Sequence, residues 1–492
     1  MNMQTWLILL PLLIPFAGVP LTLMTRKRMR LQTVLAVILM FAALGVSLAL
    51  LHSVMTRGSI TLQMGAWQAP FGITLMADPL GVFMLVMSHL VFAAGFLYAT
   101  GSTEKVTKYP TFYPLFFALA TGLSGAFLTG DLFNLFVFAE IIVISGAALT
   151  ASADDKFGVE AAYKYFYIST LGAVFFLLGV GSMYVSYGTL NLADLSNQIA
   201  ENPATPLTGA ALAFLTATFL IKSAAVPFHF WQPDFHAAAP TAVSAMLSSL
   251  VVKVGVYAFF RMTTLLFPEV TALKTLLVII GVAGVLYGGF GALGTHNAKR
   301  MLAYSTLAQI GFILVGIGWG TPLSLAAALV FTFNHALIKA AMLMLAGAMA
   351  SRAAVKSASF EVIVGVGKYH PFAGILFLLG SMALAGIPPL NGFISKLMIF
   401  QSGVASANFV PLLIIGVASI ITVTYVIRAF IKVWFEPNAE AKPKAGDRLI
   451  APALLIALSL ILGVWAEPLV SLAQSVAVWM SEPLLYSALV IK

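Results

Sequence analysis

The stretch PFAGILFLLGSMALAGIPPLNGFISKLMIFQ, residues 371–401, is long and apolar enough to cross a membrane, yet it contains a proline pair and a lysine. A membrane helix needs about 20 apolar residues. Pro388 and Pro389 cannot continue a regular helix. Irregular backbone survives at membrane depth only where protein buries it or where it lines a water-filled cavity. The stretch therefore predicts a broken membrane helix inside a helical bundle, with Lys396 just beyond the break.

The composition extends this interpretation to the whole chain. Hydrophobic residues make up 61% of the 492 positions, and only 9% are charged. Such a composition is typical of an all-α polytopic membrane protein. The net charge of +9 would suggest nucleic-acid binding in a soluble chain, but these basic residues fall in short loops, so we expect no nucleic-acid partner. Because the chain has no cysteine for thiolate-bound metals or iron–sulfur clusters, we expect no cofactor.

Apolar runs and helix breakers predict about fourteen transmembrane helices. We expect them near residues 4–24, 32–54, 74–99, 111–129, 131–150, 163–187, 207–226, 241–262, 270–291, 301–319, 324–350, 371–401, 408–435 and 449–468. Most basic loop residues follow odd-numbered helices, and the exceptions are Arg57, Arg261, Lys274 and Lys492. The positive-inside rule then places the odd loops in the cytoplasm and both termini outside.

Five charged residues are expected inside the membrane: Glu140, Lys222, Lys253, Lys339 and Lys396. Each would cost about 2.5–3.5 kcal/mol at the bilayer centre unless it is paired or hydrated. A lysine near a helix end can instead reach the interface, but Lys222 and Lys253 lie far from a loop or beside a break. Alternating acidic and basic groups at membrane depth indicate a proton relay.

We expect two helix breaks, each beside a lysine, because Pro227 follows Lys222 and the pair Pro388–Pro389 precedes Lys396. Interrupted helices at corresponding places in two halves indicate a transporter with inverted repeats. We therefore expect helices 1–3 in residues 1–110, a first five-helix repeat in 111–262, a second in 263–435, and the last helix with its tail in 436–492. Ordinary proline kinks are the alternative, but a lysine beside each break favours function.

Four motifs carry a resemblance to a known family. They are TGDLFNLFVFAE (129–140), WQPDFHAAAPT (231–241), NHALIKA (334–340) and NGFISK (391–396). These motifs resemble those of the antiporter subunits of respiratory NADH-quinone oxidoreductase and of Mrp-type multisubunit Na⁺/H⁺ antiporters, and the first motif is most similar to the D subunit of the latter. The middle pumping subunit of the quinone reductase has a glutamate where this chain has Lys396. The resemblance implies a secondary transporter subunit and not an enzyme.

The resemblance also implies roles for individual residues. Glu140 and Lys222 would form the charge pair that couples a subunit to its neighbour. Such a pair can act as a switch, because a nearby carboxylate favours the charged form of a lysine and burial opposes it. Lys253 would accept the proton at the middle of the membrane. A purely structural ion pair is the alternative for Glu140.

His335 and Lys339 would relay the proton from Lys253. Their i, i+4 spacing places both on one face of a helix. Lys396 would then pass the proton toward the outer half-channel. Lysine and histidine suit this chemistry because both can titrate near neutral pH in suitable surroundings. A hydrogen-bonded core histidine is the alternative for His335.

Four further residues are secondary candidates. Asp234 and His236 lie in an expected cytoplasmic loop, where they would form a proton entrance, although Asp234 would equally suit a helix cap. Asp78 and Asp131 lie near helices and carry a weaker signal.

Together with the resemblance, these observations predict a proton-translocating subunit of a multisubunit Na⁺/proton antiporter in the inner or plasma membrane of a bacterium. Its partners would be other membrane subunits, protons, Na⁺ and the lipid bilayer. The chain has no dense cluster of carboxylates for a sodium site, so we expect sodium to cross elsewhere in the complex. The alternative is a proton-pumping subunit of a redox-driven complex, such as NADH-quinone oxidoreductase or a membrane-bound hydrogenase. An inert scaffold is a third possibility, but five costly buried charges argue against it.

Overall fold

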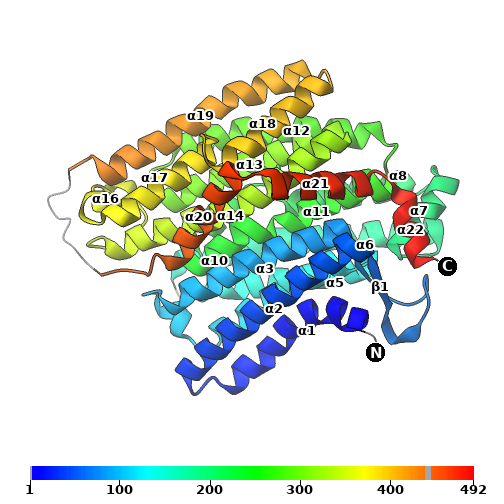
Figure 1. Cartoon of the computed structure of the whole chain (residues 1–492), viewed down its shortest axis with the longest axis horizontal. Coiled ribbons are helices and arrows are strands. Elements are labelled where there is room, and N and C mark those ends of the chain that lie inside the picture. Colours follow the sequence, from blue (N-terminus) through cyan, green and yellow to red (C-terminus); the bar gives the residue numbers. More distant parts are fainter. Residues whose placement is uncertain (1–2, 154, 438–444, 492) are drawn as a thin grey trace.

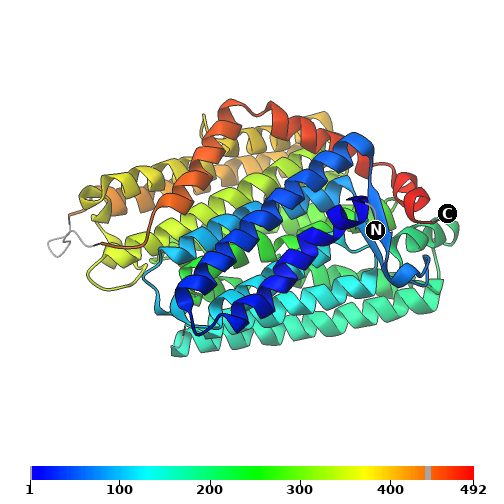
Figure 2. The same cartoon turned by 60° about the horizontal axis from the view of Figure 1, so that its bottom comes forward.

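The structure, a computed structural model, describes residues 3–153, 155–437 and 445–491. It is a bundle of helices that run roughly along the long axis of the molecule (Figure 1). The first helix begins and the last helix ends toward the same end of the bundle in both views (Figures 1 and 2). This arrangement agrees with an even number of membrane crossings. Which side of the membrane that end faces stays a prediction.

The amino-terminal elements are α1 (Met3–Met24), α2 (Met29–Arg57), β1 (Ile60–Gln63), η1 (Met64–Ala66), β2 (Thr74–Ala77), α3 (Pro79–Thr100) and η2 (Lys105–Lys108). The strands β1 and β2 form an antiparallel hairpin, with Ile60 opposite Ala77. The expected helix over 74–99 was therefore wrong at its start. Residues 74–77 pair with β1, and the helix begins at Pro79, where Asp78 caps it and proline fits the first turn.

The central elements are α4 (Phe112–Leu128), α5 (Leu132–Ala151), α6 (Lys156–Tyr187), α7 (Leu192–Glu201), α8 (Thr208–Lys222), α9 (Gln232–Ala238), α10 (Thr241–Met246), η3 (Leu247–Val251), α11 (Lys253–Arg261) and η4 (Met262–Leu266). The segments η3 and η4 are π-helical. They interrupt the expected helix over 241–262, so α11 is a short α-helical piece between two π segments. Such segments are frequent at functional sites.

The remaining elements are α12 (Thr271–Gly294), α13 (Ala298–Trp319), α14 (Pro322–Arg352), α15 (Phe360–Ile363), α16 (Val366–Tyr369), α17 (Pro371–Ala385), α18 (Asn391–Ala405), α19 (Phe409–Trp434), α20 (Ile450–Val464), α21 (Glu467–Met480) and α22 (Pro483–Val490). The predicted break at Pro388–Pro389 is confirmed, since it separates α17 from α18. The helix expected over 449–468 ends earlier, and α20 meets α21 at a bend of 80°.

The described residues contain ten helices that are long and apolar enough to cross a membrane, or up to twelve if each of two bent pairs is one span. Two shorter apolar helices are α4 and α8. The polytopic, all-α class is confirmed, whereas the count of fourteen stays a prediction.

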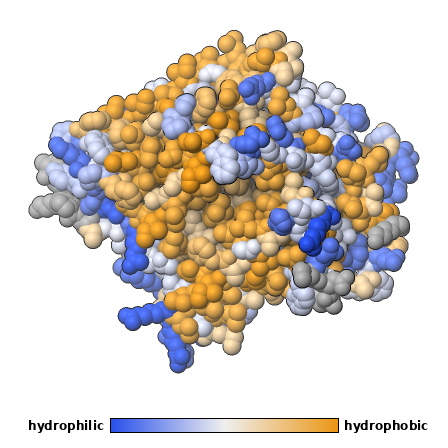
Figure 3. Space-filling view, viewed as in Figure 1, coloured by the Kyte–Doolittle hydropathy of each residue, from blue (hydrophilic) through white to orange (hydrophobic). Residues whose placement is uncertain are grey.

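The helices differ sharply in burial. All residues in the most apolar window of Thr241–Leu266 are buried, as are 94% of those in the windows of α13 and α14. In α1, α2 and α19 only 28% of the residues in the most apolar window are buried, so these helices lie on the outside of the bundle. Much of the surface in Figure 3 is hydrophobic, which suits contact with lipid or with neighbouring membrane subunits. The central helices therefore form a core in which most side chains are shielded from the surface of the molecule.

Candidate functional site

Glu140 and Lys222 form an ion pair, as the sequence predicts. Nζ of Lys222 lies 3.0 Å from Oε1 of Glu140. The lysine side chain is 8% exposed and the glutamate 25%. Lys222 is the last residue of α8, where the carbonyl end of the helix favours a positive charge. Glu140 thus reaches the outer face of α5 while its partner lies inside the bundle.

The chain leaves regular helix directly after Lys222. Ala224 has a positive φ of 54°, and Pro227 follows. The predicted break in this helix is therefore confirmed. The loop expected between the helices at 207–226 and 241–262 was partly wrong, because Gln232–Ala238 forms the helix α9, with Pro233 in its first turn.

Lys253 and His335 contact each other in the core. Nζ of Lys253 lies 2.5 Å from Nδ1 of His335, and both residues are buried. Lys253 is the first residue of α11, and only Val252 separates it from the π segment η3. Nε2 of His335 has no hydrogen-bond partner among the described residues. A buried polar atom of this kind is a position where an ordered water commonly binds.

Lys339 lies one turn after His335 on α14 and is fully buried. Its ammonium donates a hydrogen bond of 2.9 Å to the carbonyl oxygen of Leu302 on α13. The common helix face expected for His335 and Lys339 is thus directed into the core. His335 is hydrogen-bonded to Lys253 through Nδ1 only, so both the relay role and the alternative of a hydrogen-bonded core histidine stay predictions.

Lys396 lies in α18, just beyond the second break. Its ammonium donates a hydrogen bond of 2.7 Å to the carbonyl oxygen of Ala385, the last residue of α17. The same nitrogen lies 5.6 Å from the centroid of the Phe312 ring, within the range of a cation–π contact. At both breaks a lysine therefore lies at the carbonyl end of a half-helix. Lys222 is itself the last residue of α8. Lys396 belongs to α18 but reaches back to the carbonyl end of α17.

Asp234 and His236 do not lie in a loop together. Both belong to α9, and they have different surroundings. Asp234 is 20% exposed and pairs with Lys164 at 3.3 Å and with Arg300 at 3.1 Å. It caps none of the described helices, so the capping role was wrong. His236 is fully buried beside Trp231, and neither ring nitrogen has a hydrogen-bond partner within the described ranges.

Asp131 caps α5. Its Oδ1 accepts a hydrogen bond of 2.7 Å from the backbone N–H of Asn134. Burial raises the pKa of the Asp131 carboxyl, and the backbone N–H groups of Asn134 and Phe133 partly oppose this rise. The structure gives Asp131 a local structural role.

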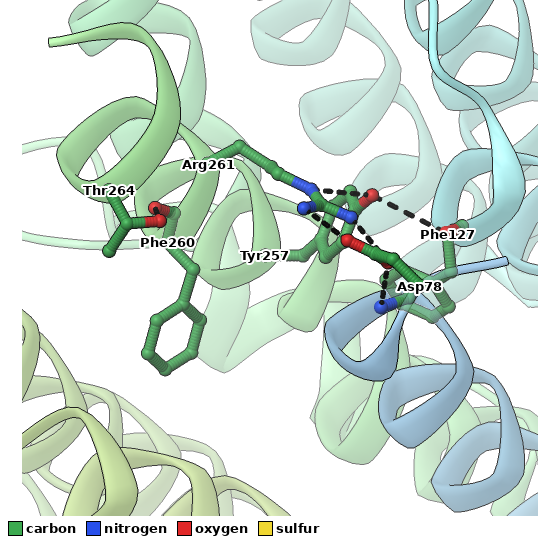
Figure 4. A network of polar contacts seen from close by, with 7 residues as sticks. Asp78, Phe127, Tyr257, Phe260, Arg261 and Thr264 are labelled. Atoms are coloured by element: carbon green, nitrogen blue, oxygen red, sulfur yellow. Dashed lines mark hydrogen bonds and ion pairs between the residues drawn. The ribbon is translucent and has the colours of Figure 1, made fainter. Parts of the chain in front are cut away.

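Asp78 also caps a helix, but it has a second partner. Its Oδ1 accepts from the backbone N–H of Gly81, and its two carboxylate oxygens lie 2.7 and 2.6 Å from the guanidinium of Arg261. Figure 4 shows the two side chains directed toward each other, with Tyr257 beside the guanidinium. The expectation that Arg261 lies in a loop was wrong, since it ends α11 and is 4% exposed.

A small cavity of about 10 Å³ lies beside Lys222. Val251 and Val254, on either side of Lys253 in the sequence, line it together with Ser169. This volume is at the lower limit for a single water molecule. The described residues contain no group of three or more histidine, aspartate or glutamate side chains that would hold a metal ion.

Comparisons with known proteins bear on the family and the fold of the chain. The family described as NADH:quinone oxidoreductase/Mrp antiporter matches residues 129–422, more than half of the chain. The D subunit of the Na⁺/H⁺ antiporter of Alkalihalophilus pseudofirmus is 33% identical over 99% of both chains. The Mrp complex from Dietzia sp. contains a chain with a TM-score of 0.91 at 23% identity, covering 100% of both chains. A chain of the membrane-bound sulfane sulfur reductase, an archaeal respiratory membrane complex, has a TM-score of 0.90 at 30% identity over 99% of both chains. By this match and this identity, the chain belongs to the NADH:quinone oxidoreductase/Mrp antiporter family of membrane subunits.

Proposed function

We propose that the chain is the proton-translocating subunit of a multisubunit Na⁺/proton antiporter in a bacterial plasma membrane. One observation carries the proposal: protonatable side chains lie in the core of a largely apolar bundle or at its edge. They are Glu140, Lys222, Lys253, His335, Lys339 and Lys396. Such groups are costly at membrane depth, so their presence favours a role in moving charge. The relative from Alkalihalophilus pseudofirmus, an antiporter D subunit that matches along nearly its whole length, supports the antiporter class.

The ion pair of Glu140 and Lys222 would be the switch. Each buried charge is tolerable only while its partner stays close. If the Glu140 carboxylate is drawn away, for example by a neighbouring subunit at the exposed face of α5, Lys222 is left in apolar surroundings and sheds its proton. The quarter exposure of Glu140 supports this, because it leaves the carboxylate accessible from outside the bundle.

The next steps would run through the central helices. The small cavity beside Lys222 would hold one water between it and the start of α11. Lys253 and His335 are already in hydrogen-bond contact, so a proton can pass between their nitrogens without a large movement. Water at the free nitrogens of His335 and His236 would continue the path toward Lys339 and toward the entrance.

The second half would carry the proton from Lys339 to Lys396. Both ammonium groups donate to a backbone carbonyl, which stabilises the charged form without a permanent counter-ion. We further propose that residues 111–262 and 263–435 are inverted repeats, each with one helix broken beside a lysine. Proton entry would be driven by the membrane potential, worth about 2.3 kcal/mol per charge per 100 mV, and coupled to sodium export by other subunits.

A second candidate function is proton pumping in a redox-driven complex. The likeness to a chain of the membrane-bound sulfane sulfur reductase, at 30% identity, favours it. The two functions share the proton path and differ in what drives it. Subunits with flavin or iron–sulfur absorbance that purify with the chain would establish the redox alternative.

The decisive experiment measures sodium-dependent collapse of a pH gradient in everted vesicles of an antiporter-deficient host. The host expresses the chain with its whole operon, as the native sequence, as Lys253→Ala, or as Lys27→Ala. Lys27 is exposed between α1 and α2 and serves as the matched control. We expect Lys253→Ala alone to abolish exchange. Exchange that survives Lys253→Ala, or proton movement that occurs only with a redox substrate of the complex itself, would refute the antiporter proposal.

A further inference from the structure

A hollow of about 510 Å³ opens at the end of the bundle where α1 turns into α2. Arg30, Thr33 and Val34 line it from the first turns of α2, and Thr107, Lys108 and Tyr113 line it from the connection between α3 and α4 and from α4 itself. Arg30 and Lys108 are the only charged residues that line it in the described part of the chain, and both are exposed. Neither forms an ion pair with an acidic residue that the structure describes.

A buried side chain ties together the two segments that carry Arg30 and Lys108. Nε2 of Gln32 donates hydrogen bonds of 2.9 Å to the carbonyl oxygen of Thr22 and 2.8 Å to that of Pro110. These bonds tie the start of α2 to the end of α1 and to the chain two residues after Lys108. The arrangement is therefore built into the fold and does not depend on free loop positions.

An apolar stripe continues from the mouth along the outside of α2. Arg30, Val34, Ile38 and Phe41 follow one another at helical spacings of four, four and three residues, which places them on one face. Val34 is 55% exposed, Ile38 60% and Phe41 46%. In Figure 3 the hydrophilic side chains at the lower left, where Figure 1 places the α1–α2 turn, border a hydrophobic surface.

We propose that this hollow binds the headgroup of an anionic phospholipid such as phosphatidylglycerol, with an acyl chain along Val34, Ile38 and Phe41. Charge complementarity identifies the headgroup: of the described residues, two unpaired basic side chains and no acidic one line the hollow. Basic pockets between membrane helices bind such headgroups in other proteins. The start of α2 adds to the attraction, because no side chain within the described ranges caps its first backbone N–H groups.

The opposite end of α2 provides an internal comparison. A second hollow there, of about 400 Å³, is lined by Val54, Gly58, Pro79, Trp479 and other uncharged residues. It lies on the same lipid-facing helix and has a similar volume, yet none of the described residues that line it is charged. Basic residues thus line the hollow at the start of α2 and do not line the hollow at its end.

Photo-crosslinking of the assembled complex in membranes tests the proposal. One probe is phosphatidylglycerol with a diazirine on an acyl chain, and the second is the matching phosphatidylcholine. Labelled peptides are mapped after chymotryptic digestion, so that changes at basic residues do not alter the cleavage sites. The variants are Arg30→Gln, Lys108→Gln and, as the matched control, Arg57→Gln, an exposed arginine at the other end of α2.

We expect phosphatidylglycerol to label residues 31–41 more strongly than phosphatidylcholine does. Each of the two substitutions at the hollow should reduce this labelling about fivefold at limiting probe, whereas Arg57→Gln should leave it unchanged. Equal labelling by both probes, or labelling that neither Arg30→Gln nor Lys108→Gln reduces, would overturn the proposal. Displacement of the phosphatidylglycerol probe by millimolar inorganic phosphate would overturn it too, because the ligand would then be a free anion.

Discussion

The ammonium nitrogen of Lys396 lies 2.7 Å from the carbonyl oxygen of Ala385, so the side chain reaches back across the break to the end of α17. Gly386 makes this approach possible. Its φ is +82°, and a Cβ at this position would lie 2.6 Å from Cδ of Lys396. No real Cβ tolerates such a distance without displacement of its neighbour. The break therefore positions the ammonium group of Lys396, which we propose carries protons, on the carbonyl end of a half-helix, where a cation is favoured.

Gly386→Ala is accordingly expected to impair transport. An alanine at this φ costs about 1–2 kcal/mol and must also push the Lys396 side chain away from Ala385. We expect exchange in everted vesicles to fall roughly tenfold to a hundredfold, because small misplacements of a reacting group have effects of this size. Gly181→Ala in α6 is the control, since no neighbouring atom of the described residues lies within 4 Å of a Cβ placed there. Equal exchange by the two variants, at equal amounts of protein in the membrane, would contradict this role of Gly386.

Lys253→Arg separates charge from proton transfer. An arginine keeps the positive charge in the core but does not release its proton under any physiological condition. We expect sodium-dependent collapse of the pH gradient to be lost, as in Lys253→Ala, although the complex still assembles. Lys27→Arg, at the exposed turn before α2, should exchange normally. Retained exchange by Lys253→Arg would mean that Lys253 provides only a fixed charge beside His335.

Glu140→Ala tests the switch against a purely structural ion pair. Removal of Glu140 leaves Lys222, whose side chain is 8% exposed, without its partner. We expect coupled exchange to be abolished while the amount of complex in the membrane stays close to normal. Glu160→Ala is the matched control, because Glu160 pairs with Lys164 at 2.6 Å with side chains 60% and 42% exposed. Exposed pairs of this kind contribute roughly 0–1 kcal/mol. Loss of the Glu140→Ala protein from the membrane would instead assign Glu140 a structural role.

The sequence predicts those parts of the fold that leave a strong local signal. Proline at 227 and at 388–389 excludes regular helix, and the structure breaks near both positions. Charges such as Lys253 and Lys339 stand out because their burial is costly, and both are fully buried. The ion pair of Glu140 and Lys222 followed from the family resemblance, since sequence spacing alone does not place residues 82 positions apart in contact.

Other features leave no such signal. Hydropathy does not distinguish α-helical from π-helical hydrogen bonding, so the π segments beside α11 could not be predicted. The strand β2 is as apolar as the helix after it, and only pairing with β1 reveals it. Arg261 ends an apolar run, and this position in the sequence favours a loop. Its spacing of eight from Lys253 and four from Tyr257, along one helix face, was the signal that could have placed it in the core.

The ion pair of Asp78 and Arg261 is expected to stabilise the fold and not to carry protons. Both side chains are buried, 0% and 5% exposed, and the guanidinium lies 5.1 Å from the ring centroids of Tyr257 and Tyr486. Tyr486 belongs to α22, so the pair links α3, α11 and the last helix. An arginine in this setting keeps its charge, which makes the pair a fixed contact.

Asp78→Asn isolates the charge, because asparagine can still cap α3 through a hydrogen bond from Gly81. Leaving Arg261 buried without a counter-ion typically costs about 3–5 kcal/mol. We expect a clearly lower midpoint of thermal unfolding for the purified complex, measured by intrinsic fluorescence at one fixed scan rate. The double variant Asp78→Asn/Arg261→Met removes both charges and should recover most of the loss, since methionine can pack between the two tyrosine rings. A double variant as unstable as Asp78→Asn would show that Arg261 matters beyond neutralising Asp78. Loss of exchange in a double variant of native stability would instead place the pair on the proton path.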